Sequence, residues 1–116
     1  MELRVERRTA LYAALSRLQA ALELADLWEE ERPADDALAS ELPFSYDTLC
    51  LHQWLQWRFI PRIRGILDRN EVLPTACAIY PYAEDQLDEA ELVQAEVLMV
   101  IRELDELISA RGEQAH

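Results

Sequence analysis

The chain has 116 residues, of which 51% are hydrophobic and 29% are charged, a balance that fits one globular domain over residues 1–116. Its net charge of −12 argues against direct binding to nucleic acids and to anionic membranes, because both need a basic surface. No apolar run is long enough to span a membrane and no secretory leader is visible, so we expect a cytoplasmic protein with reduced cysteines.

A first helix is predicted from about residue 3 to residue 31. Its apolar residues recur at intervals of three, four and seven, which places them on one helical face: Val5, Tyr12, Leu15, Leu18, Leu22 and Ala25. Arginines lie in its first half and glutamates 29–31 close it, so charges oppose the helix macrodipole at both ends. The ends therefore need packing to stay ordered.

Residues 32–47 are predicted to form a packed connector, because Pro33 and Pro43 interrupt any helical pattern. A short helical turn is expected near residues 35–40, and the text LPFSYD suggests an extended piece that carries two aromatic rings. Asp47 and Thr48 come just before the next predicted helix, where such residues usually act as N-caps. The alternative is that they form a polar anchor in a pocket.

A second helix is predicted over residues 48–70. Its apolar side chains lie nearly all round, without a broad polar face, which is typical of a buried central helix. Trp54 and Trp57 are interpreted as core residues against which other elements pack. Pro61 lacks an N–H and its ring clashes with the carbonyl of Trp57, so we predict a kink within one turn of it. Asn70 ends this helix.

A second packed connector follows, and then a last long helix. Pro81 is expected to open a short helical turn that reaches Leu87. The long helix is predicted over residues 88–110, with a core stripe of Val93, Val97, Val100, Ile101, Leu104, Leu107 and Ile108. The tail 112–116 is expected to be disordered. The sequence thus predicts an all-α fold, a small helical bundle of about four helices with a kinked, buried central helix.

Ordered blocks between Pro43 and Glu84 resemble the YqcC-like family of small bacterial proteins: PFSYDT, WLQWRFIPRI, LP and CAIYPYAE. The resemblance implies a small helical bundle without an assigned biochemical function. Its members are often encoded beside a tRNA pseudouridine synthase, which makes such an enzyme a candidate partner. Leu51 stands where relatives tend to have proline, and Arg58 where an apolar residue is common. The residues that match the family pattern are Pro43, Phe44, Asp47, Thr48, Trp54, Leu55, Gln56, Trp57, Ile60, Pro61, Arg62, Leu73, Pro74, Pro81, Tyr82 and Glu84.

The candidate binding surface lies around the kinked helix and the aromatic connectors. Its rings either fill the core or line a groove, because so many amphipathic rings are hard to bury in a small domain. Arg58, Arg62 and Arg69 share a helical stripe, and they either pair with acidic residues such as Asp47 and Asp68 or bind an anion. Arg62 is the strongest candidate of the three, because it matches the family pattern. The predicted surface consists of Tyr46, Asp47, Trp54, Trp57, Arg58, Arg62, Tyr80 and Tyr82.

No catalytic, cofactor or metal site is predicted. Cys50, His52 and Cys77 do not suggest zinc, because Cys-x-His on a helix points the side chains apart and a fourth ligand is missing. Cys77 also lacks the electropositive setting of a reactive thiol. Gly65 and Gly112 are the only glycines, so the chain has no glycine-rich phosphate loop.

These observations favour a non-catalytic binding or accessory protein with an unidentified protein partner, for which a pseudouridine synthase is the candidate. One alternative is a small enzyme or ligand-binding protein with a pocket around Asp47, Arg62 and Tyr82. Another is a self-associating structural bundle, so a homo-oligomer remains open. The acidic run EDQLDEAE, residues 84–91, is interpreted as a solvated helix start, with docking of a basic partner as its alternative.

Overall fold

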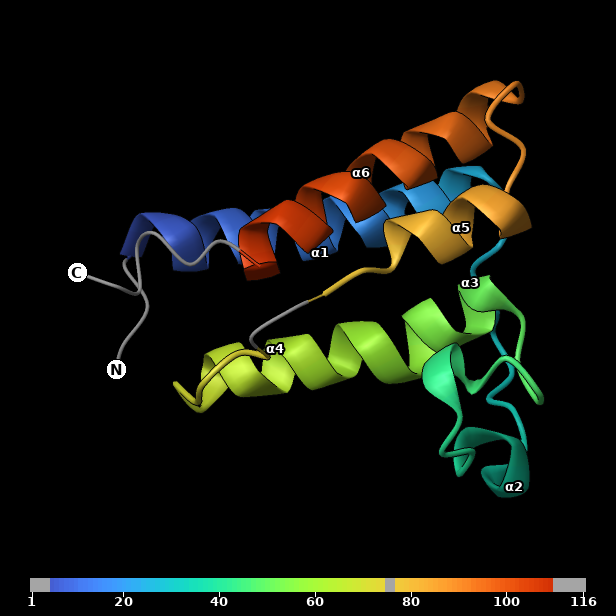
Figure 1. The fold of residues 1–116 in the computed structure, drawn as a ribbon, viewed down its shortest axis with the longest axis horizontal. Coiled ribbons are helices and arrows are strands. Elements are labelled where there is room, and N and C mark those ends of the chain that lie inside the picture. The colour runs from blue at the N-terminus through green and yellow to red at the C-terminus, as the bar shows by residue number, and fades with distance from the viewer. Residues whose placement is uncertain (1–4, 75–76, 110–116) are drawn as a thin grey trace.

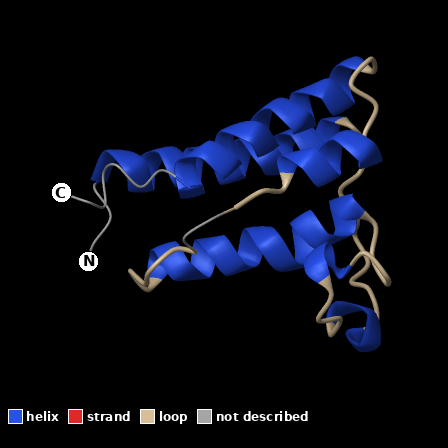
Figure 2. Cartoon of the chain, viewed as in Figure 1, coloured by secondary structure: helices blue, strands red, loops and turns tan. Residues whose placement is uncertain are grey.

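The computed structural model describes residues 5–74 and 77–109, and the regular elements in these ranges are all helical (Figure 1; Figure 2). This confirms the predicted all-α fold. The expected tail 112–116 lies outside the described residues. The elements in chain order are α1 (Val5–Leu24), α2 (Asp35–Leu38), the 3-10 turn η1 (Pro43–Ser45), α3 (Leu51–Trp54), the π-helical turn η2 (Leu55–Phe59), α4 (Ile60–Asp68), α5 (Tyr80–Gln86) and α6 (Leu92–Ser109).

Helices α1 and α6 run antiparallel and form the main packing pair (Figure 1). Helix α4 packs against α1, and α5 packs against α6. The predicted core stripes of both long helices are mostly confirmed, although Val5 is 75% exposed and does not share them. The buried apolar residues of the pair are Leu11, Ala14, Leu15, Leu18, Ala21 and Leu22 from α1, and Val97, Leu98, Val100, Ile101, Leu104 and Ile108 from α6.

Helix α1 ends at Leu24, seven residues before the end that the sequence predicts. Asp26 has a φ of 60°, a left-handed conformation that ends a helix. The Asp26 N–H donates to the Glu23 carbonyl (3.1 Å) and the Leu27 N–H to the Leu22 carbonyl (2.9 Å), which is the Schellman pattern. Asn70 ends α4 in the same way, with a φ of 55°. The prediction for Asn70 is therefore confirmed.

The arginines near the start of α1 make hydrogen bonds to neighbouring helices. These contacts compensate for the unfavourable position of a positive charge at a helix N-terminus. Arg7 donates to the carbonyl oxygens of Leu107 and Ile108 in the last turn of α6, and Arg8 donates to that of Leu67 in the last turn of α4. A cation stabilises the C-terminus of a helix and destabilises its N-terminus. The arginines that are unfavourable at the start of α1 therefore stabilise the C-termini of α6 and α4, which run antiparallel to α1.

The connector before α3 differs in detail from its prediction. Helix α2 confirms the expected short turn, but the predicted extended piece is a tight turn in which Phe44 and Ser45 have φ values of 57° and 48°. The next helix starts at Leu51, and its N-cap is Cys50, not Asp47 or Thr48. The Thr48 hydroxyl donates to the Ala37 carbonyl (2.7 Å) instead, so it ties the connector to α2.

The second predicted helix is interrupted one turn before Pro61. In η2 the Ile60 N–H donates to the Leu55 carbonyl, five residues earlier. A π turn and a proline are both recognised causes of helix kinks, and the ribbon bends between α3 and α4 (Figure 1). The wider turn lets the chain pass the proline ring without the clash of a regular α-helix. The prediction that this helix lacks a polar face is wrong, because Arg62 and Asp68 are exposed along α4.

The segment before α5 is anchored on α6. The Asp105 carboxylate accepts from the N–H groups of Ile79 (3.0 Å) and Tyr80 (2.7 Å). Ser109 accepts from the Cys77 N–H (2.9 Å) and donates to its carbonyl. These bonds set the position of one wall of the candidate site.

Candidate functional site

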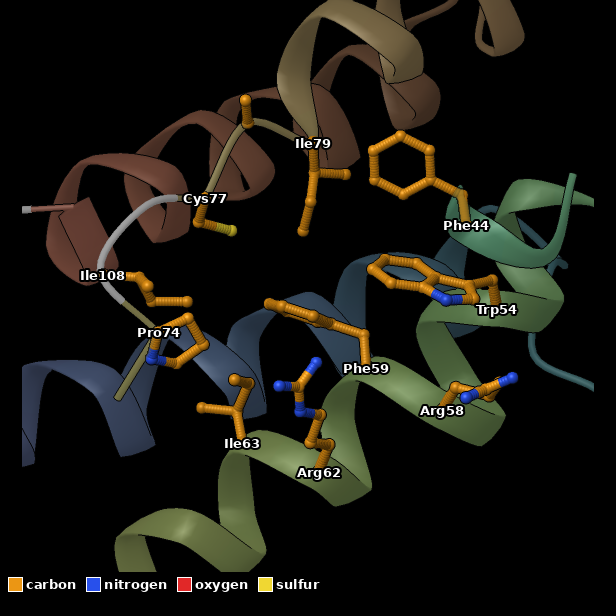
Figure 3. Close-up of a pocket in the computed structure, with 11 residues that line it drawn as sticks. Phe44, Trp54, Arg58, Phe59, Arg62, Ile63, Pro74, Cys77, Ile79 and Ile108 are labelled. Carbon is orange, nitrogen blue, oxygen red and sulfur yellow. The ribbon is translucent and has the colours of Figure 1, made fainter. Parts of the chain in front are cut away.

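A cleft of ≈ 480 Å³ opens between the interrupted helix and the two connectors (Figure 3). One wall comes from η2 and α4, the other from the segment that Asp105 anchors, and η1 closes one end. We call it the aromatic cleft; the residues that define it are Phe44, Trp54, Arg58, Phe59, Arg62, Pro74, Cys77 and Ile79.

A chain of aromatic contacts builds one end of the cleft. Tyr82 stacks on Phe44 at a centroid distance of 4.7 Å, and Phe44 meets Trp54 edge-on at 5.1 Å. Trp54 in turn stacks on Phe59 at 5.4 Å. Contacts of these geometries stabilise a packed arrangement beyond simple area burial. They also explain how Phe44 keeps its positive φ, since its ring is held on two sides.

The contact of Trp54 with Phe59 depends on the π turn. In an α-helix, residues five apart point about 140° away from each other around the axis. The wider turn of η2 brings the two rings together on one side. Trp57 then lies on the other side of the helix, in a shallow depression with Trp28 and Gln56.

Arg58 is fixed by backbone oxygens. Its Nη1 donates to the carbonyls of Leu38 (2.6 Å) and Ser40 (2.8 Å). The expectation that it pairs with Asp47 is therefore wrong, because Asp47 accepts a hydrogen bond from the Ser40 hydroxyl instead (2.6 Å). Arg58 acts as a brace between η2 and the first connector.

Arg62 differs from Arg58 in having none of its donors engaged by the described residues. It is exposed, and in Figure 3 its side chain extends from α4 toward Phe59 and Pro74. Asp68, the other expected partner of the stripe, accepts from the Tyr12 hydroxyl (2.6 Å). Arg62 is therefore the cation that the cleft has available for a ligand or a partner.

Cys77 is the one thiol of the cleft, and its surroundings make it unreactive. Burial, and after it the carboxylate of Asp105 to which the thiol donates (3.1 Å), together raise the pKa of the thiol to about 12. Arg62 acts in the opposite direction but more weakly. At neutral pH the thiol is protonated and is no nucleophile.

The structure brings together only part of the predicted surface. Trp54, Arg58 and Arg62 line the cleft, and Tyr82 reaches it through its stack on Phe44. Phe44 was not among the residues predicted for the surface, although its position in a packed connector and its match to the family pointed to it. Phe59 and Ile79 were not included either, since only the π turn and the Asp105 anchor place them there.

The other predicted residues lie elsewhere. Tyr46 and Asp47 are exposed on the turn after η1, and neither Asp47 nor Tyr82 lines the cleft to which Arg62 contributes. Tyr80 faces α6, where the Arg102 guanidinium lies 5.9 Å from its ring centroid.

The interpretation of Trp57 as a core residue is wrong. It is partly exposed and lies outside the buried cluster to which Trp54 contributes. Its indole N–H is buried without a hydrogen-bond partner in the described part of the chain. A helical wheel at 100° per residue already places Trp57 between Arg64 and Asp68, away from the buried residues, so the core interpretation rested on the size of its side chain and not on its position.

Within residues 5–74 and 77–109, no group of three or more His, Cys, Asp or Glu side chains is arranged to hold a metal ion. None of the helices in these ranges is long and apolar enough to cross a membrane.

Comparisons with known proteins identify relatives over most of the chain. An uncharacterised protein of Haemophilus influenzae is 40% identical over 93 residues, which are 80% of this chain and 87% of the relative. The uncharacterised protein YqcC of Escherichia coli is 35% identical over 95 residues, 82% of this chain and 87% of that protein. The tRNA pseudouridine synthase C of Pectobacterium carotovorum is 34% identical over 70 residues, which are 60% of this chain but only 19% of that protein.

A solved structure agrees with the fold. The solution NMR structure of protein YqcC from E. coli superposes with a TM-score of 0.77 at 32% identity, and the match covers 90% of this chain and 89% of that one. A family model named DUF446 and described as tRNA pseudouridine synthase C matches residues 10–107. The chain therefore belongs to the DUF446 family, the family of small YqcC-like helical proteins.

Proposed function

We propose that the chain is a non-catalytic accessory protein that binds a tRNA pseudouridine synthase, and that it acts in the cytoplasm where such an enzyme meets tRNA. The observation that carries the proposal is the match to the Pectobacterium carotovorum synthase, in which the related segment makes up only 19% of the protein. In that protein a covalent link keeps the segment at high local concentration beside the rest of the chain. A separate chain needs a binding surface to reach the same proximity.

The chemistry of the cleft supports a binding role and not a catalytic one. General acid–base catalysis needs a titratable group within hydrogen-bond reach of the reacting atoms. The described lining offers two arginines, which stay charged, and a thiol that is protonated at neutral pH. Its remaining side chains are apolar or aromatic, as is usual at the centre of a protein interface.

The partner is proposed to be the enzyme itself and not its RNA. The net charge of −12 disfavours contact with phosphate backbones. An acidic accessory protein and an enzyme with a basic RNA-binding surface are instead electrostatically compatible.

Affinity purification of the tagged chain from its native cell tests this function. We expect tRNA pseudouridine synthase C in the eluate, and the reciprocal purification should return this chain. Ala78 is exposed and lines the cleft, so Ala78→Trp should block binding, whereas Ala20→Trp on the exposed side of α1 should not. Absence of the synthase from the wild-type eluate would contradict the proposal.

Self-association is a second candidate, which one observation favours. Leu92 and Met99 of α6 are 83% and 67% exposed, more than is usual for large apolar side chains. A symmetric contact there, however, would bring the exposed carboxylates Glu91 and Glu96 of two chains together. A solution mass near a multiple of 13.4 kDa would establish self-association, and a monomer mass would exclude it.

A further inference from the structure

We propose that the aromatic cleft docks a segment of the partner protein in which an apolar or aromatic side chain lies beside a carboxylate, and that Arg62 recognises the carboxylate. This inference rests on the proposed function and names the chemistry of the partner. The rings and aliphatic side chains select the apolar group, while the guanidinium selects the charge.

The shape of the cleft fits a few side chains. Its volume of ≈ 480 Å³ lies within the range of pockets that enclose small ligands, about 300–1,000 Å³. Phe59, Pro74 and Ile79 face the open space in Figure 3. An apolar side chain that enters the cleft is transferred from water to an apolar surface, which is favourable. The contacts of Asp105 and Phe44 already hold that surface in place before anything binds. Such a preformed site binds with little loss of conformational entropy.

The two arginines of the cleft have different roles. Arg58 uses its Nη1 for three acceptors, among them the Ser45 hydroxyl (3.3 Å), and so belongs to the wall. Arg62 has no such contacts among the described residues, and its planar fork matches a carboxylate in a bidentate manner. When a partner segment covers the cleft and displaces its water, such a pair becomes stronger than on an open surface.

The carboxylates of this chain that lie nearby are already occupied. Asp105 accepts from Ile79, Tyr80 and the Cys77 thiol. At the end of α4, Glu71 pairs with Arg69 (3.0 Å). In a chain of net charge −12, Arg62 is an exposed arginine that lines the cleft and has no partner within residues 5–74 and 77–109, and an acidic group on the partner is its natural complement.

A nucleobase is a poorer occupant than a protein side chain. Base recognition needs free ring faces on which a base can stack. Here Phe44 and Trp54 give ring faces to Tyr82 and Phe59. The rings at this end of the cleft thus spend part of their faces on one another, and the lining also includes the aliphatic side chains of Ile63, Ile79 and Ile108, which suit an apolar side chain.

Calorimetric titration of the purified chain with tRNA pseudouridine synthase C from the same cell, at about 0.15 M salt, tests the proposal. We expect Arg62→Gln to raise the Kd at least about tenfold, and Arg62→Lys to raise it less, since the charge remains but the fork is lost. Arg69→Gln, directly after the last residue of α4 and outside the cleft, is the matched control and should stay within about twofold of the wild type. Thermal melts should be alike for all three variants.

Charge exchange identifies the occupant. Acidic residues of the synthase that lie next to apolar ones, within the segment protected from hydrogen exchange by the complex, are changed singly to lysine. One of these lysine variants of the synthase should bind the wild-type chain more weakly. The same variant should bind the Arg62→Glu chain better than the unchanged synthase does, because the two charges have been exchanged.

The outcomes are separable. If the wild type binds and Arg62→Gln binds equally well, the docking proposal is wrong while the proposed function stands. If the wild type does not bind, both are wrong. If 3-phenylpropionate binds at micromolar concentration and the synthase does not displace it, the cleft is a small-molecule site and the docking proposal is wrong. If RNA competes with the synthase for the cleft, it is equally wrong.

Discussion

The guanidinium of Arg7 closes the C-terminus of α6: its Nε lies 2.8 Å from the carbonyl oxygen of Leu107, and its Nη2 lies 2.9 Å from that of Ile108. The two ends of the described chain are thus joined across 100 residues by one buried side chain. The last carbonyls of a helix have no partner within it, and a cation there also offsets the macrodipole.

Arg7→Met should therefore destabilise the fold by about 2 kcal/mol, because two carbonyls lose their charged donor. Arg17→Met is the matched control. Arg17 pairs with Glu103 at the surface, where such a contact contributes at most about 1 kcal/mol. Urea denaturation of both variants measures the difference, and an equal loss in the two would show that the Arg7 contact is unimportant.

Asp105→Asn should loosen the wall of the cleft. The two carboxylate oxygens of Asp105 accept hydrogen bonds from the N–H groups of Ile79 and Tyr80. An asparagine has one acceptor oxygen, so its NH₂ group, a donor, would face one of these N–H donors. We expect a loss of about 1–3 kcal/mol in the free energy of unfolding. Faster amide exchange at Ile79 and Tyr80 than in the wild type checks that the effect is local. Unchanged exchange at these two amides would contradict the anchoring role of Asp105.

The two cysteines should differ in reactivity. Cys50 is exposed, whereas the pKa of the Cys77 thiol is raised to about 12 by burial and by Asp105. Iodoacetamide at pH 8 should therefore label Cys50 first in the native protein, and both thiols should react alike in urea. Peptide mass spectrometry reads out the site, and early labelling of Cys77 would show that its thiol is accessible and ionised.

The same shift has a consequence for stability. The folded-state pKa of Cys77 lies above the unfolded value of 9.0, so the neutral thiol is favoured by folding. Its contribution is complete below about pH 9 and is lost as the pH rises toward about 12. Between pH 8 and pH 11, the wild type should lose more stability than Cys77→Ala. Equal losses would contradict the shift.

Trp54 and Trp57 should differ in how much they contribute to the free energy of unfolding. Trp54 packs on the core and on two rings, so Trp54→Ala should cost about 3 kcal/mol. Trp57→Phe should cost less than about 1 kcal/mol, since it removes a buried N–H that has no partner in the described part of the chain. Denaturant midpoints decide this, and a larger loss for Trp57→Phe would restore Trp57 as a core residue.

Much of the fold could be predicted from periodicity. The buried stripes of α1 and α6 follow from the spacing of their apolar residues. Asn70 correctly predicted the end of α4, and Pro61 correctly predicted an interruption of the second predicted helix. The early end of α1 could not be predicted, because Asp26 takes a left-handed conformation that aspartate adopts only in some contexts.

The candidate site was less predictable, for two physical reasons. The π turn shifts the helical phase, so a wheel drawn at a constant angle misses the pairing of Trp54 with Phe59. Arg58 donates to the backbone carbonyls of Leu38 and Ser40. Every residue has a backbone carbonyl, so the amino-acid sequence does not indicate which of them Arg58 will contact. Arg62 was predicted on the right helix, but its lack of partners among the described residues is visible only in three dimensions.

Sedimentation of the chain together with purified tRNA pseudouridine synthase C shows whether the two proteins bind each other as proposed. At about 10 μM of each, we expect a complex with one copy of each chain, as a Kd in the low micromolar range or below requires. Two separate boundaries at this concentration, unchanged by mixing, would contradict the claim.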